Sequence, residues 1–270
     1  MKQALIVGAG LTGGVIARRL AEEGYRIDII ERRNHIAGNM YDYMDEFGVA
    51  LHKYGPHTFH TNDVELYKFM NIYGEWRDYR LSCGAQIDGV VTPTPFNFKT
   101  IDDFFSKEDA NRIKESFLRT YQGKKTITVV EAMECGDKYI RKFAEFLFEK
   151  DYRPYTAKQW GVSLNKIDLS VLKRVPLRIG YEEGYFEDKY QMMPAVSYVS
   201  FFEKLLDHPN IKVSLNVEAL EHLKVRDDHM TYDGKKIEFP VVYTGAIDEL
   251  FGGIMGFLPY RSVDFQSLRV

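Results

Sequence analysis

Three glycines close to the N-terminus have the spacing that binds the pyrophosphate of a dinucleotide. The apolar run at residues 3–7 leads into Gly8, Gly10 and Gly13, and a helix-like run follows at residues 15–20. Gly8 permits a sharp turn, Gly10 lets the backbone approach a phosphate, and Gly13 lets a helix pack closely on the strand. The helix would direct free N–H groups and the positive end of its dipole at the phosphates. The pattern predicts a strand, a tight turn and a phosphate-binding helix.

A carboxylate completes this pattern at the end of the next apolar run, residues 26–31. Glu31 stands 21 residues after Gly10, the spacing at which an acid accepts hydrogen bonds from both hydroxyls of an adenosine ribose. The negative charge of Glu31 disfavours a 2′-phosphate, so the sequence favours NAD or FAD over NADP.

The segment that follows the ribose acid favours FAD. Gly38 and Asn39 return the backbone to the nucleotide seven residues after Glu31, which an ordinary NAD domain does not need and the diphosphate and ribityl chain of FAD do. Gly245 predicts another close backbone approach near the end of a strand. Arg32 either pairs with the adenine side or a phosphate of the cofactor, or is a solvated surface residue.

Three histidines, His52, His57 and His60, occur within nine residues. The Gly-Pro pair at residues 55–56 indicates an irregular loop instead of the helical face of a metal site, so we expect no metal. We place His57 beside the isoalloxazine ring, with a packed loop histidine as the alternative, and we expect His60 to be structural.

A second group of residues that could bind a nucleotide lies further along the chain. Tyr155 and Trp160 flank a lysine and a glutamine, a combination that stacks a nucleobase and reaches its polar edges, or that forms an aromatic plug between domains. Arg178 follows Lys173 and Arg174 on an extended segment, where its planar fork is suited to a diphosphate.

Composition limits the classes of function. The 270 residues include 36 basic and 39 acidic ones, a net charge of −3, so no global field attracts nucleic acid or an anionic membrane. The separated Cys83 and Cys135 form no ligand set or disulfide framework. The apolar start carries glycines at dinucleotide-fold positions and is not read as a signal peptide, and no run approaches the ~20 apolar residues of a membrane span. We expect a soluble cytoplasmic protein.

Periodicity and turn residues predict the elements that position these groups. The sequence predicts helices at 62–76 and 196–206, a helical region at 101–160, hairpins turning at Asp88-Gly89 and Asp233-Gly234, and strands at 211–217, 237–244 and 258–270. The fold class is therefore α/β, with a Rossmann-like FAD-binding domain (1–78 and 196–250), an inserted helical substrate-binding domain (100–165) and an antiparallel sheet region (79–99, 166–195 and 251–270).

Taken together, these motifs resemble the bacterial UDP-galactopyranose mutase family over essentially the whole chain. The glycine motif is generic, whereas the histidine loop at 52–62 and the Tyr-Thr-Ala-Lys-Gln-Trp-Gly segment at 155–161 are specific. The resemblance implies interconversion of UDP-galactopyranose and UDP-galactofuranose, used for cell-surface polysaccharides, through an adduct between the N5 of reduced FAD and galactose. It also implies NAD(P)H or another reductant as a partner, and allows a homodimer.

The resemblance assigns roles to individual positions. Tyr155 and Trp160 would frame the uridine, Tyr185 would line the sugar-diphosphate pocket, Arg178 would hold the diphosphate from a mobile loop, and His57 would flank the flavin. His57 and Arg178 are thus the expected catalytic residues.

The sequence also departs from the family pattern. Ala37 replaces a frequent glycine, and family chains continue past Tyr260 with more sheet, further phosphate-binding arginine and tyrosine positions, and a Gly-Gly-Arg segment at the flavin. We therefore expect the chain by itself to bind FAD poorly and turn over slowly or not at all. A non-catalytic remnant that binds UDP or FAD, and a different flavin-dependent oxidoreductase, stay open as alternatives.

Overall fold

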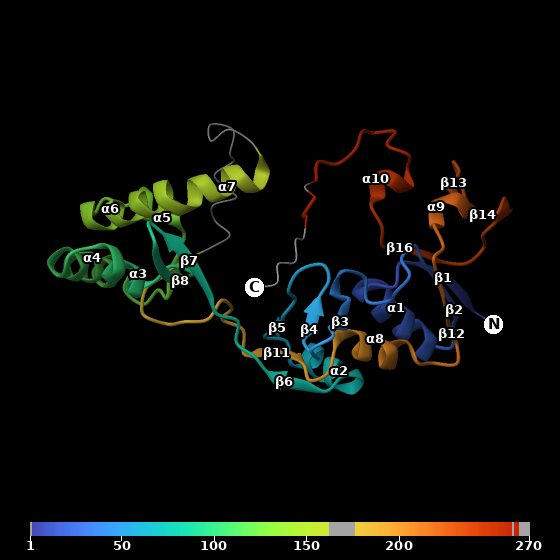
Figure 1. Cartoon of the computed structure of the whole chain (residues 1–270). Coiled ribbons are helices and arrows are strands. Elements are labelled where there is room, and N and C mark those ends of the chain that lie inside the picture. Colours follow the sequence, from blue (N-terminus) through green and yellow to red (C-terminus); the bar gives the residue numbers. More distant parts are fainter. Residues whose placement is uncertain (1, 162–175, 261, 265–270) are drawn as a thin grey trace. The chain divides into compact units, whose positions relative to one another are not determined.

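The computed structural model describes residues 2–161, 176–260 and 262–264 (Figure 1). The chain divides into two compact units, one formed by residues 1–79 with 189–270 and the other by residues 80–188. The antiparallel region that we predicted as a third part is shared between them. Its hairpin, at residues 80–99, lies with the helices of the second unit, and strand β11 (Tyr190–Pro194) pairs within the first.

A four-stranded parallel sheet organises the first unit. Its order is β12 (Ile211–Leu215), β2 (Arg26–Glu31), β1 (Gln3–Val7) and β16 (Val241–Tyr243). The strand order reverses at β1, because β2, the next strand along the chain, lies on one side of it and β16, from far downstream, lies on the other. Such a reversal leaves a crevice at the carboxyl ends of the strands, where doubly wound folds bind their ligands.

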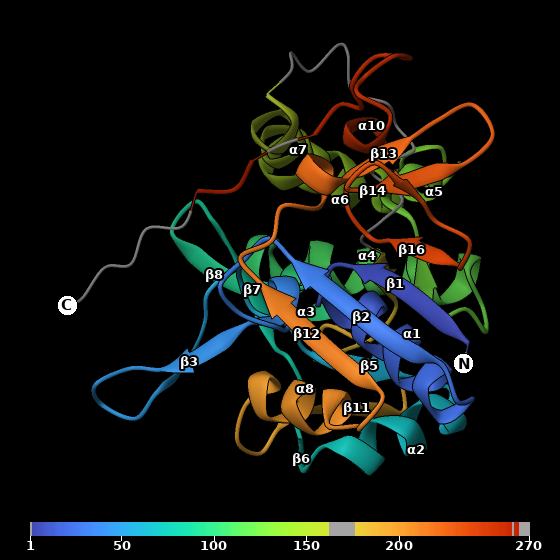
Figure 2. The ribbon, with the colours of Figure 1, turned by 90° about the vertical axis from the view of Figure 1, so that its right-hand side faces the viewer.

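Side chains alternate along β1, so the sheet has two buried faces. Figure 2 shows the four strands of the sheet with α1 (Leu11–Glu22) beside them. Ala4 and Ile6 face helices α1 (Leu11–Glu22) and α8 (Tyr198–Leu206), which pack so closely that a Cβ on Gly14 would lie 3.2 Å from Leu205. Leu5 and Val7 face the other side. That side is covered by α9 (Ala219–His222) and the antiparallel strands β13 (Leu223–Val225), β14 (Met230–Tyr232) and β15 (Lys235–Lys236).

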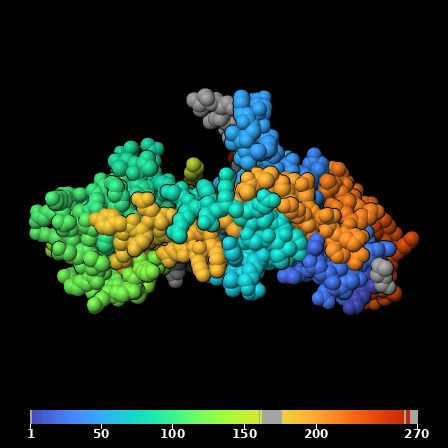
Figure 3. Space-filling model, turned by 90° about the horizontal axis from the view of Figure 1, so that it is seen from below, coloured from blue at the N-terminus to red at the C-terminus, as the bar shows by residue number. Residues whose placement is uncertain are grey.

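The remaining elements of the first unit surround this sheet. A hairpin of β3 (Asp42–Met44) and β4 (Ala50–His52) stands out from the unit (Figure 3). The others are a 3₁₀ turn at Gly38–Met40, β5 (Phe59–Thr61), α2 (Val64–Tyr73), β6 (Trp76–Asp78) and α10 (Ile247–Leu250).

The second unit is mainly helical, around an aromatic core that includes Phe96, Phe117 and Phe143. The predicted hairpin at Asp88-Gly89 is confirmed. Capping boxes begin two helices of this unit, one formed by Asn97 with Thr100 and the other by Thr128 with Glu131. Its elements are β7 (Cys83–Ile87), β8 (Val90–Thr94), α3 (Phe98–Phe104), α4 (Lys107–Thr120), β9 (Thr126–Ile127), α5 (Val129–Met133), α6 (Lys138–Leu147), a π-helical turn at Phe148–Tyr152, α7 (Arg153–Trp160) and β10 (Leu177–Arg178).

One predicted element is wrong where the structure describes it. Residues 258–260 and 262–264 are irregular instead of forming a strand, because no described strand pairs with them, while α10 was not predicted. Every helix in the described ranges is too short or too polar to span a bilayer.

Candidate dinucleotide-binding site

A cavity of about 410 Å³ opens at the carboxyl ends of β1 and β16. Residues that the sequence placed at the cofactor meet around it, although they come from four separate segments of the chain. They are Gly8, Gly10, Glu31, Arg32, Gly38, Asn39 and Gly245. Of the other predicted cofactor residues, Gly13 and His57 do not line this cavity.

The glycine turn has no room for side chains. Gly8 has φ +104°, and a Cβ there would lie 2.1 Å from Oγ1 of Thr244. A Cβ on Gly13 would lie 1.9 Å from the carbonyl oxygen of Gly8, so Gly13 supports the turn from beneath the cavity. Thr244 closes the other side, since its hydroxyl donates to the carbonyl of Val7 at 2.7 Å. The backbone is therefore free to approach a ligand directly.

The loop after β2 packs on the glycine turn itself. Gly38 has φ +55°, and a Cβ there would lie 2.8 Å from the Cα of Gly10. The N–H of Ala37 donates to the carbonyl of Ala9 at 2.9 Å, with Ala37 in the left-handed region at φ +73°. Ala37 thus adopts a conformation that glycine adopts more readily.

Glu31 joins these two segments. Its side chain is buried, with one carboxylate oxygen accepting from the N–H of Ala9 and the other from the N–H of Arg33, both at 2.8 Å. A carboxylate accepts about four hydrogen bonds, so Glu31 keeps acceptor capacity towards the cavity. Arg32 is exposed and approaches Glu249 at 3.9 Å.

Several residues of the cavity were missed from the sequence. Thr12 lies at the start of α1, Glu218 just after β12, and Glu249 in α10. The position of Glu218 just after a predicted strand could have indicated it, because residues just after parallel strands converge at one edge of the sheet. Placing Glu218 at the cavity also required the order of the strands, which the sequence did not give.

His57 is held by its own loop. Its N–H donates to Nδ1 of His52 at 3.0 Å, its Nδ1 lies 2.8 Å from the carbonyl oxygen of Gly55, and its carbonyl accepts from the hydroxyl of Tyr198 at 3.0 Å. Because a carbonyl only accepts, Nδ1 of His57 carries the proton. Nδ1 of His52 must be unprotonated, in keeping with burial, which lowers the pKa of His52.

The predicted substrate residues lie in the second unit. Tyr155 on α7 is exposed, with its hydroxyl accepting from the amide of Gln159 at 3.0 Å. Trp160 ends α7, and its side chain lies outside the described residues, as do Lys173 and Arg174. Tyr185 is half-buried, and Arg178 is buried. Within the described part of the chain, no group of three or more His, Cys, Asp or Glu side chains could hold a metal ion.

Two family models match this chain. One, described as UDP-galactopyranose mutase, matches residues 150–270, and the other, an NAD(P)-binding Rossmann-like domain, matches residues 6–73.

Curated relatives match along nearly the whole chain. It is 36% identical over 267 residues to a probable UDP-galactopyranose mutase from Klebsiella pneumoniae, covering 98% of this chain and 66% of that protein. It is 35% identical to dTDP-fucopyranose mutase from Escherichia coli, covering 99% and 69%, and 34% identical to UDP-galactopyranose mutase from Mycoplasma pneumoniae, covering 98% and 67%. The chain therefore spans about two thirds of the length of these relatives.

Solved structures support the fold. A crystal structure of reduced UDP-galactopyranose mutase matches with a TM-score of 0.66 and 19% identity, over 93% of this chain and 57% of that one. A putative protoporphyrinogen oxidase from Exiguobacterium matches with a TM-score of 0.56 and 15% identity, over 93% and 61%. The fold is α/β, with a Rossmann-like domain, a helical unit and several antiparallel sheets. On the identity and coverage of its curated relatives, the chain belongs to the UDP-galactopyranose mutase family.

Proposed function

We propose that this protein interconverts UDP-galactopyranose and UDP-galactofuranose with reduced FAD as its cofactor. Family membership supports the reaction, and one observation carries the cofactor assignment. The glycine turn, the Gly38 loop and the Glu31 carboxylate converge on one cavity at the carboxyl edge of the parallel sheet.

The residues around this cavity fit the adenosine diphosphate part of FAD. Helix α1 has Gly10 as its N-cap, and among the described residues no side chain caps its first N–H groups, so these groups are available to the diphosphate. Gly10 and Gly38 would bring backbone against the phosphates, and Glu31 would accept from the ribose hydroxyls. Arg32, Asn39 and Gly245 complete the cofactor residues that we propose.

When bound, reduced FAD would supply the nucleophile for the sugar, which leaves the protein to position, orient and exclude water. Tyr155 and Trp160 would frame the uracil, and Tyr185 would line the sugar-diphosphate pocket. His57, with its Nδ1 proton committed to Gly55, would present Nε2 as an acceptor beside the flavin. These roles rest on the family resemblance, and each is open to substitution.

The test incubates purified protein with FAD, dithionite and UDP-galactofuranose, and follows UDP-galactopyranose by chromatography. Parallel reactions use dTDP-fucopyranose, because a relative of similar identity is named for that sugar, and a control omits dithionite. We expect slow conversion of the UDP sugar, and only with reduced FAD.

Other outcomes would overturn the proposal in distinguishable ways. Conversion of the dTDP sugar alone would change the substrate. UDP binding by folded protein that takes up no FAD would indicate a non-catalytic remnant, and steady NAD(P)H oxidation without isomerisation would indicate an oxidoreductase.

A further inference from the structure

Arg178 is turned inwards, against its own chain. Its side chain is 4% exposed, and its two terminal nitrogens donate to backbone carbonyls, Nη1 to Glu182 at 3.3 Å and Nη2 to Tyr185 at 3.4 Å. Nε lies 3.6 Å from a carboxylate oxygen of Glu187 and has no hydrogen-bond partner among the described residues. The guanidinium therefore fills the inside of the turn at residues 182–185.

Asn97 also donates a hydrogen bond to the carbonyl of Glu182. Its amide Nδ2 donates to the carbonyl of Glu182 at 3.1 Å, while its Oδ1 accepts from the N–H of Lys99 at the start of α3. Because Oδ1 must accept at the cap, the amide orientation is determined, and the nitrogen faces Glu182. Asn97 is 1% exposed, so this link is shielded from water.

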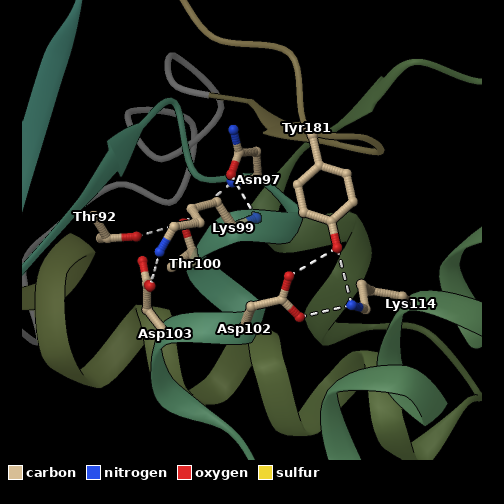
Figure 4. Close-up of polar contacts among 8 residues, drawn as sticks. All are labelled: Thr92, Asn97, Lys99, Thr100, Asp102, Asp103, Lys114 and Tyr181. Atoms are coloured by element: carbon tan, nitrogen blue, oxygen red, sulfur yellow. Dashed lines mark hydrogen bonds and ion pairs between the residues drawn. The ribbon is translucent and has the colours of Figure 1, made fainter. Parts of the chain in front are cut away.

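Further contacts fix both sides of the turn to the helical unit. The hydroxyl of Tyr181 donates to Asp102 at 2.7 Å, and Lys114 donates to Asp102 at 2.6 Å and to Tyr181 at 2.9 Å (Figure 4). On the other side, the N–H of Tyr185 donates to the carbonyl of Leu81 at 2.7 Å. The backbone of Tyr185 is thereby held from both directions.

We propose that Arg178 and Asn97 are positioning residues that clamp the turn at 182–185 and so set the place of Tyr185, and that Arg178 does not itself bind the substrate diphosphate. The inference rests on the proposed function for the identity of the substrate. To reach a phosphate, the guanidinium would have to give up both carbonyl bonds. The carbonyl of Glu182 would keep its bond from Asn97, but the carbonyl of Tyr185 would lose the donor that holds it, which is costly.

The surroundings of Arg178 also disfavour a diphosphate. It lines a cavity of about 350 Å³ together with Lys99, Glu182 and Glu183. The ammonium of Lys99 is already paired with Asp103. Two carboxylates beside the same space oppose a doubly charged anion. Arg178 can hold the turn in place without any anion in this cavity.

The test compares Asn97→Asp with Arg178→Lys. Asn97→Asp keeps the cap acceptor and replaces the amide donor to Glu182 with a charged acceptor oxygen, and Arg178→Lys keeps the charge and removes the planar fork. The control is Arg112→Lys on the exposed surface of α4. Amide hydrogen exchange, measured without any ligand, should show the Tyr185 N–H exchanging about tenfold faster in both variants than in the control. Unchanged exchange in folded Asn97→Asp would overturn the clamp, even if Arg178→Lys failed to fold.

UDP titration then separates a clamp from a direct ligand. If Arg178 and Asn97 clamp the turn, Asn97→Asp and Arg178→Lys should both weaken UDP binding. Arg178→Lys should then cause no further loss of UDP affinity in protein that already carries Tyr185→Ala. Normal UDP binding by Asn97→Asp, with additive losses for Arg178→Lys and Tyr185→Ala, would make Arg178 a direct ligand and overturn the inference. Failure of wild-type protein to bind UDP would instead overturn the proposed function, and the exchange result would still decide the clamp.

Discussion

Glu31 serves the fold as well as the proposed cofactor. Both of its carboxylate oxygens accept backbone N–H groups, from Ala9 in the glycine turn and from Arg33 in the following loop. A side chain that only contacted ribose would be dispensable in the free protein. Glu31 is not, because losing it leaves the buried N–H of Ala9 and the part-buried N–H of Arg33 unpaired.

We therefore predict that Glu31→Gln destabilises the FAD-free protein by about 1–3 kcal/mol. The amide has one acceptor oxygen in place of two, so one of the two N–H groups faces an NH₂ donor. Thermal unfolding without FAD measures the loss, and FAD titration should show weaker binding as well. An unchanged melting temperature together with weakened FAD binding would mean that Glu31 contributes to cofactor binding and not to the stability of the fold.

Gly13 should tolerate no larger residue. A methyl group would lie 1.9 Å from the carbonyl oxygen of Gly8, and backbone must move to accommodate it. We expect Gly13→Ala to cost at least about 3 kcal/mol and to abolish FAD binding. The control is Gly136→Ala, where a Cβ meets nothing within 4 Å. Equal melting temperatures for the two variants would show that the turn can widen.

His52 should make stability depend on pH. Burial lowers its pKa below the ordinary 6.5, with the charge of Asp42 opposing and that of His57 adding to the shift. The unfolded state then binds the proton more tightly than the native state. This contribution is present above pH 6.5 and is lost as the pH falls through the lower native pKa, where protonated Nδ1 can no longer accept from His57.

The measurement is the free energy of unfolding against pH, with His52→Gln as the comparison. Glutamine keeps an acceptor and does not titrate. We expect the difference between wild-type and His52→Gln protein to shrink as the pH falls. Parallel curves across this range would show that His52 keeps its ordinary pKa.

At the scale of elements, Asp42 connects the β3–β4 hairpin to α8. Its two carboxylate oxygens accept from the first N–H groups of that helix, Tyr198 at 2.7 Å and Val199 at 3.0 Å, and its side chain is buried. The cap therefore comes from a segment more than 150 residues away, in addition to the local cap of Ser197. Since Tyr198 also bonds the carbonyl of His57, the helix start supports the histidine loop.

We predict that Asp42→Ala costs about 2–3 kcal/mol of stability, more than the ~1 kcal/mol of an ordinary exposed cap. Asp63→Ala, at the exposed start of α2, is the matched control. Chemical denaturation of both variants measures the two losses. Similar values would show that Ser197 alone suffices at α8.

At the scale of the whole molecule, the two units have separate cores. Phe143 is buried in the aromatic cluster of the second unit, and Phe201 in a cluster of the first. We predict that Phe143→Ala and Phe201→Ala each lower the free energy of unfolding by about 3–5 kcal/mol. Each substitution should affect the unfolding transition of its own unit. Calorimetry with and without FAD distinguishes them, because a ligand raises only the transition of the unit that binds it.

Phe201→Ala should lower the FAD-sensitive transition, and Phe143→Ala the other, with FAD affinity unchanged in the latter. A single transition that both variants shift equally would mean that the units unfold as one. Proteins of more than one unit often depart from two-state unfolding.

Local chemistry made much of the fold predictable. The first strand, turn and helix follow from the apolar run and the glycines, and the Asp88-Gly89 hairpin follows from its turn residues, which have φ of +48° and +86°. The segment that begins at residue 258 misled the prediction, because apolar residues in an extended run form a strand only where a partner strand is present.

The sequence alone determined the dinucleotide motif, the carboxylate of Glu31 at its expected offset and the resemblance to a mutase family, since each depends on residue type and short-range spacing. Tertiary structure decided what the side chains contact over long distances. It placed Thr244 against Gly8, Asp42 on α8 and the Arg178 fork inside its own turn. The sequence does not reveal whether the guanidinium of an arginine such as Arg178 is exposed or buried. Only the structure shows which carbonyls surround it.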